Sequence, residues 1–75
     1  MTVSELRQLY QQQAFKEAEI LQDAILPGWI VEFRGQDGKL YEMTDTLGCP
    51  RYFGSVEEAR QHVHLVADCP IQVEH

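Results

Sequence analysis

A tight turn at Asp37 and Gly38 places the strongest constraint on how this chain folds, because it separates two segments with strand-like patterning. Glycine after aspartate is typical of a hairpin turn, since glycine adopts a positive φ at little cost. Apolar and polar residues alternate in residues 29–34 before the turn and in residues 40–45 after it. A period of two predicts strands with one buried face. On that face we expect Trp29, Val31, Phe33, Tyr41 and Met43.

Helical patterning precedes and follows this hairpin. Apolar residues recur at about 100° per residue through residues 3–26. Pro27 ends the pattern, because the residue before a proline is disfavoured in the α conformation, and we expect one long first helix. Ser55 and Glu58 have the spacing of a capping box, in which each side chain accepts a hydrogen bond from the other residue's backbone amide. They predict a second helix that runs to about Ala67.

Two shorter strands complete the pattern, one at residues 51–53 and one at residues 71–74. The sequence thus predicts a single α+β domain over residues 1–75, with the element order α-β-β-(β)-α-β. We expect a three- to four-stranded antiparallel sheet with two helices on one face. The other face would then be open, lined by Ile30, Glu32, Arg34, Leu40, Glu42 and Thr44.

Length and charge limit the classes of function. A domain of 75 residues buries only about 60% of the surface that its unfolded chain exposes. A homodimer would add buried area, so a monomer and a homodimer are both retained as alternatives. The formal net charge of −6 disfavours unaided binding to nucleic acid, which depends on Lys and Arg neutralising phosphates. The sequence lacks the pattern of a signal peptide and an apolar run long enough to span a membrane. We therefore expect a cytoplasmic protein with no membrane association.

Several side chains fall outside the expected core and are candidates for contact with a partner. Phe15 lies nearly opposite the apolar stripe of the first helix, and Ile20 lies at the edge of that stripe. Leu65 lies opposite the core face of the second helix, and three further residues would flank the open face of the sheet. The candidate partner-binding residues are Phe15, Ile20, Arg34, Arg51, Tyr52 and Leu65.

Four residues could ligate a metal, namely Cys49, His62, His64 and Cys69. Structural zinc sites pair their ligands at short spacing. Here the two histidines are two residues apart on a helix and diverge by about 200°, and the cysteines stand alone. Both cysteines precede a proline, and this dipeptide resembles a short motif by which some regulatory proteins bind haem. A metal or haem sensor is therefore an alternative, whereas no resident cofactor and no catalytic residue are expected.

The turn, strand and cap residues in the last two thirds of the chain resemble those of a known group of proteins. They include Gly28-Trp29-Ile30-Val31, Asp37-Gly38, Thr44-Asp45, Gly48, Arg51-x-Phe53 and Ser55-x-Glu57-Glu58-Ala59. The pattern is similar to small uncharacterised proteins carried by proteobacterial plasmids and integrative elements, some of them encoded beside partition or maintenance genes. The resemblance implies an accessory role in plasmid or element maintenance and brings no catalytic residues.

The leading hypothesis is a non-enzymatic interaction module that binds another protein or itself. One alternative is a nucleic-acid-binding accessory protein that uses a local basic patch of Arg34, Lys39, Arg51 and Arg60. The metal or haem sensor is the other.

Overall fold

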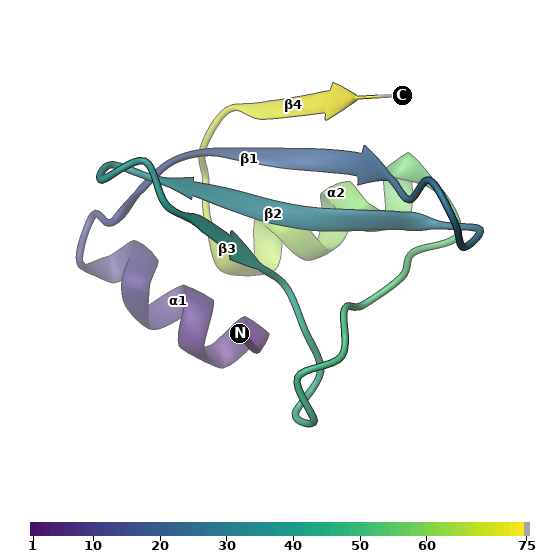
Figure 1. Ribbon diagram of the computed structural model, residues 1–75. Helices are drawn as coiled ribbons and strands as arrows, with labels where there is room; N and C mark the ends of the chain where they lie inside the picture. The colour runs from purple at the N-terminus through teal and green to yellow at the C-terminus, as the bar shows by residue number, and fades with distance from the viewer. Residues whose placement is uncertain (75) are drawn as a thin grey trace.

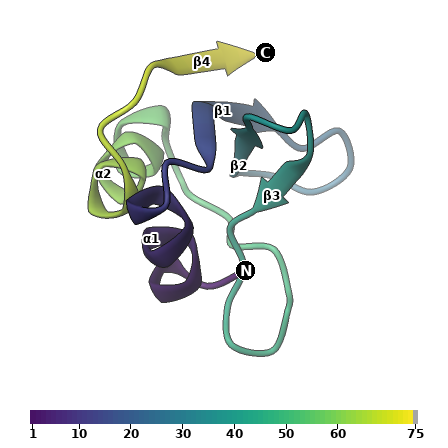
Figure 2. The same ribbon diagram turned by 90° about the vertical axis from the view of Figure 1, so that its left-hand side faces the viewer.

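The computed structural model describes residues 1–74 and shows two helices and a four-stranded sheet (Figure 1). The predicted α+β class and the element order are confirmed. Both helices lie on the same side of the sheet (Figure 2). The elements are α1 (Val3–Gln11), β1 (Phe15–Gln22), β2 (Trp29–Gly35), β3 (Leu40–Glu42), α2 (Val56–Val66) and β4 (Ile71–Glu74).

The strands lie in the order β3-β2-β1-β4. The β1–β2 and β2–β3 pairs are antiparallel, whereas β4 runs parallel to β1. The prediction of a wholly antiparallel sheet is therefore wrong for β4. The reason is topological: α2 carries the chain back along the sheet before β4 begins, and a crossover of this kind joins parallel strands. None of the described helices is long and apolar enough to cross a membrane.

The predicted long helix over residues 3–26 is wrong. The helix ends at Gln11, and Gln13 takes a left-handed φ of 59°. The amide of Gln13 donates to the carbonyl of Tyr10 at 2.9 Å, and the amide of Ala14 donates to the carbonyl of Leu9 at 3.1 Å. These two hydrogen bonds form a Schellman motif, which closes the helix and turns the chain.

The strand β1 replaces the second half of the predicted helix. Its register with β2 shifts between Phe15 and Glu17, which marks a β-bulge at Lys16. A bulge inserts one extra residue, so Phe15 and Ala18 both reach the core although they are three residues apart. Ile20 follows two residues later and is also buried. The resulting spacing of three and then two residues explains why the sequence reads as helical.

Phe15 and Ile20 therefore do not form the exposed contact surface that the helix predicted. Phe15 is only 6% exposed, and its ring stacks on Phe33 with 4.9 Å between the ring centroids. Ile20 is fully buried and lies opposite Val31 on β2. Both predictions of exposure are wrong because these side chains belong to the core face of a strand.

The expected core face of the hairpin is confirmed. Val31, Phe33 and Met43 are fully buried, and Trp29 and Tyr41 are partly buried against them. Both helices contribute to the same cluster, α1 through one side chain and α2 through three. The helical residues in the core are Leu6, Ala59, Val63 and Val66.

The predicted capping box at the start of α2 is confirmed in part. The Ser55 hydroxyl accepts a hydrogen bond from the Glu58 amide at 3.2 Å, as a capping residue should. The Glu58 carboxylate, however, accepts from the amide of Gly54 at 3.3 Å rather than from that of Ser55. The predicted strand at residues 51–53 is reduced to one isolated bridge between Phe53 and Trp29.

Candidate protein-binding surface

The open face of the sheet carries a row of carboxylates. Glu19 on β1 lies opposite Glu32 on β2, and Glu32 lies opposite Glu42 on β3. Like charges directly opposite one another are destabilising in a sheet. The charge of Glu74 on β4 also acts on Glu32. We refer to Glu19, Glu32, Glu42 and Glu74 as the acidic face.

Glu32 stands at the centre of this face. Its pKa is raised, chiefly because the carboxylate is partly buried, and further by the charges of Glu42 and Glu19. Arg34 opposes these effects, but more weakly. A cation brought by a partner would favour the charged form of Glu32 and be attracted to the carboxylates around it.

Arg34 is held by two glutamates of β1. Its Nη2 lies 2.7 Å from a carboxylate oxygen of Glu19, and its Nε lies 3.2 Å from one of Glu17. Glu19 is only 7% exposed, and this pairing compensates the burial of its charge. The predicted contact residue Arg34 thus lies on the open face, but its charge is offset locally. A nucleic acid approaching it would meet the surrounding carboxylates.

The loop between β1 and β2 presents a continuous apolar run. Residues 24–27 (Ala24, Ile25, Leu26 and Pro27) are all exposed, and we call them the apolar loop. Ile25 is 89% exposed and Leu26 is 50% exposed. Three or four consecutive exposed apolar residues are unfavourable in a water-soluble domain unless they serve a function.

Asp23 fixes the shape of the apolar loop. One oxygen of its carboxylate accepts a hydrogen bond from the Ile25 amide at 2.9 Å. The other accepts from the hydroxyl of Tyr52, also at 2.9 Å. These hydrogen bonds lower the pKa of Asp23, that from Ile25 most of all. Gly28 closes the loop with a φ of 126°, where an added Cβ would lie 3.3 Å from the carbonyl oxygen of Phe53. These contacts restrain the two ends of the loop.

The apolar loop continues onto the open face of the sheet. Leu21 and Ile30 lie opposite each other on that face, at the end of the hairpin where the loop begins. A hollow of about 330 Å³ beside the loop is lined by Pro27, Gly28, Tyr52, Phe53 and Gly54. The apolar loop thus adjoins the end of the open face at which Leu21 and Ile30 lie.

The other predicted contact residues are dispersed. Tyr52 is exposed and belongs to the loop surface through its bond to Asp23. The Arg51 guanidinium lies 5.6 Å from the centroid of the Phe53 ring. Leu65 is exposed as predicted, but it projects from α2, which covers the face of the sheet opposite to Arg34. Sequence reasoning missed the apolar loop because it assigned those residues to the end of a helix.

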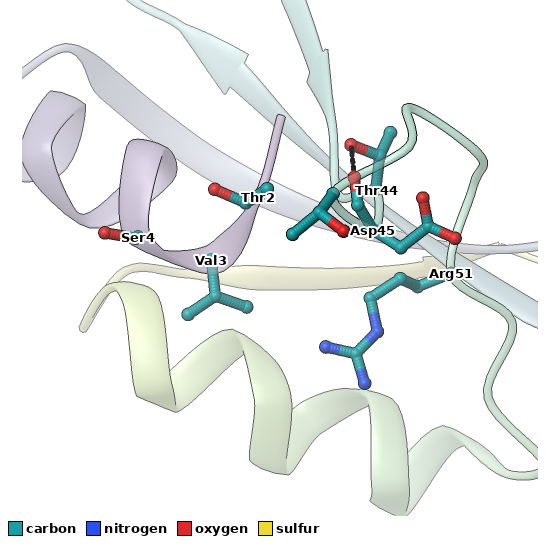
Figure 3. A pocket seen from close by; sticks show the side chains of 7 residues that line it. Thr2, Val3, Ser4, Thr44, Asp45 and Arg51 are labelled. Carbon is teal, nitrogen blue, oxygen red and sulfur yellow. Dashed lines mark hydrogen bonds between the residues drawn. The ribbon is translucent and has the colours of Figure 1, made fainter.

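A second hollow of about 340 Å³ lies between the start of α1 and the loop after β3 (Figure 3). It is lined mainly by small polar residues and by Arg51. Its acid, Asp45, accepts hydrogen bonds from the amides of Leu47 and Cys49 at 2.8 and 3.1 Å. The Thr44 hydroxyl donates to the backbone carbonyl of Asp45 at 3.1 Å. These groups stabilise a turn, and their hydrogen bonds are local.

The four candidate metal ligands do not converge. Among residues 1–74, no group of three or more His, Cys, Asp or Glu side chains is placed to hold a metal ion. Cys49 is exposed and Cys69 is half-buried, and burial raises the pKa of the Cys69 thiol. The His62 ring packs on Phe53 with 4.6 Å between ring centroids, and its Nδ1 lies 2.9 Å from the carbonyl oxygen of Glu58. His62 thus has a structural role in α2.

Comparisons with protein-family models, with curated proteins and with solved structures gave no match.

Proposed function

We propose that this protein is a non-enzymatic interaction module that binds another protein through the apolar loop and the acidic face. The observation that carries the proposal is the run of four consecutive exposed apolar residues, which follows directly on Asp23 and its hydrogen bonds from Ile25 and Tyr52. Such a loop contributes binding energy at a low entropic cost, because little ordering is required when the partner docks.

The chemistry of the surface defines the partner. Burying a side chain such as Ile25 contributes about 1.5–3 kcal/mol, so the partner needs an apolar pocket. Beside that pocket it needs Lys or Arg residues that face Glu32 and its neighbours. An anionic membrane surface fits poorly, because it would repel the acidic face.

The biological setting of this module is also part of the proposal. We infer an accessory role in the maintenance of a plasmid or integrative element. The resemblance of the turn and cap residues to proteins of such elements supports this setting.

Site-specific photocrosslinking tests the proposed surface. A photoreactive amino acid replaces Ile25 in one variant and Leu47 in a matched control, in cells that carry the native gene. Leu47 is a suitable control because it is 87% exposed and lies in a different loop. We expect a discrete crosslinked protein from position 25 and not from position 47.

Charge provides the second arm of this test. In Glu32→Lys the crosslink from position 25 should weaken, and raising the salt concentration should weaken it in the unsubstituted background as well. Equal crosslinking from both positions, or crosslinking that is insensitive to Glu32→Lys and to salt, would contradict the proposal.

A further inference from the structure

The two edges of the sheet differ in how their backbone groups are satisfied. The end of the outer edge of β3 is covered by Met1, whose amino group donates to the Glu42 carbonyl at 2.9 Å. The Thr44 amide donates in turn to the Met1 carbonyl at 2.7 Å. This cover protects that end of β3 against pairing with another chain.

The outer edge of β4 has no such cover within residues 1–74. This strand lies at one margin of the sheet in both views (Figures 1 and 2) and pairs only with β1 among the described residues. The Ala18 amide donates to the carbonyl of Pro70 at 2.9 Å, which fixes the direction of the backbone. Because these directions alternate along a strand, the amides and carbonyls of Ile71 and Val73 point away from β1.

We propose that the β4 edge pairs with β4 of a second copy of this chain, antiparallel and with Gln72 on the two-fold axis. In this register Ile71 of each copy lies opposite Val73 of the other, and their outward amides and carbonyls exchange four hydrogen bonds. Both side chains are only partly buried in the single chain, so their pairing would remove further apolar surface from water.

The same register keeps the side chains compatible. Gln72 meets the Gln72 of the second copy on the open face, and Glu74 meets Pro70, so no carboxylate faces another carboxylate across the new pair. Strand β4 is thus complementary to itself. Strand β4 shares no residue with the apolar loop, which lies in the connection between β1 and β2.

The salt dependence of association distinguishes a second copy of this chain from a different partner that would add a basic strand to the β4 edge. Each copy carries a formal net charge of −6, so self-association should strengthen as salt screens the mutual repulsion. A basic strand bound beside Glu74 would instead weaken with salt. Sedimentation velocity over a range of protein and salt concentrations measures the difference.

Val73→Pro is the decisive variant for sedimentation. Proline removes the amide that points outward and leaves the hydrogen bonds between β1 and β4 in place, as is tolerated on edge strands. Val73→Ala is the control for the lost side chain, because it keeps that amide. Relative to the control, Val73→Pro should weaken dimerisation roughly thirtyfold, since the symmetric pair loses two hydrogen bonds.

Disulfide crosslinking tests the register without relying on the stability of a proline variant. In a Cys49→Ser, Cys69→Ser background, Gln72→Cys places two thiols opposite each other at a non-hydrogen-bonded pair. The Cα separation there is about 4.5 Å, within the range of a disulfide. The matched control is Glu74→Cys, whose thiol would face Pro70. We expect mild oxidation to link the Gln72→Cys chains at least tenfold faster, since only they hold paired thiols.

A chain that stays monomeric at every protein and salt concentration overturns the proposal. So does a dimer that Val73→Pro leaves unchanged relative to Val73→Ala, or equal crosslinking of the two cysteine variants.

Discussion

Replacing Phe15 by alanine should destabilise the protein strongly, because its ring is part of the core. Only 6% of the residue is exposed, and the ring lies between Phe33 and Tyr41, with centroid distances of 4.9 and 5.6 Å. On a long first helix the same side chain would lie in solvent, where its loss would cost little. The substitution therefore separates strand from helix in this segment.

The size of the effect follows from burial. Truncating a buried phenylalanine to alanine costs about 3–5 kcal/mol, and the lost ring contacts are part of that cost. A domain of this length has a total stability of about 4–11 kcal/mol. We expect Phe15→Ala to lose about 3 kcal/mol, the lower end, because the residue lies at the start of β1. The melting temperature should fall by about 12 °C or more.

Urea denaturation followed by circular dichroism and by the fluorescence of the single tryptophan, Trp29, measures this loss. Phe15→Leu keeps most of the volume and should lose about 1 kcal/mol. Leu65→Ala is the matched control on an exposed apolar side chain and should stay within about 0.5 kcal/mol of the parent chain. If Phe15→Ala behaves like Leu65→Ala, the strand assignment and the core built on it are wrong.

Two further substitutions test the turn after α1 and the acidic face. Gln13→Gly should stabilise the protein by about 0.5–1 kcal/mol. The left-handed φ of 59° strains any residue that has a side chain, and relief of this strain should exceed the entropic cost of ordering a glycine. An unchanged urea midpoint would argue against that strain. Glu32→Gln should stabilise it by about 0.5 kcal/mol at pH 7, since the change removes a partly buried carboxylate that also faces other carboxylates. The folded-state pKa of Glu32 is raised above its usual value of 4.5, so its ionisation costs stability as the pH rises through that raised pKa. The gain should therefore vanish below pH 4.5, and a gain that persists in acid would show that the ionisation of Glu32 is not its cause.

The hairpin and the second helix could be predicted because their local signals agree with their tertiary environment. Alternation in β2 and β3 identifies the buried face, and the Asp37 and Gly38 turn fixes the connection. The Ser55 hydroxyl caps the start of α2, as the sequence predicts. Each of these features depends on neighbours in sequence, which is why patterning alone finds them.

The first strand could not be predicted in the same way, because its bulge disrupts the alternation on which strand prediction depends. Burial of Phe15, Ala18 and Ile20 gives spacings of three and two residues, which fit a helical face as well as a strand. Length was the available counter-signal. The expected helix of about 20 residues would be about 30 Å long at 1.5 Å per residue, which is long for so small a domain. The longest extent of the folded chain is 33 Å.

The apolar loop was hidden by the same ambiguity. Ile25 and its neighbours extend the helical pattern, so assigning this segment to a helix predicts that they are buried in the core. Once β1 ends at Gln22, those apolar residues must lie in a connection between strands, and connections run over the surface. Burial therefore cannot explain why Ile25 and Leu26 are apolar, whereas a partner that covers them can. The exposed run is thus a better guide to function than any residue that the helical pattern had placed on the surface.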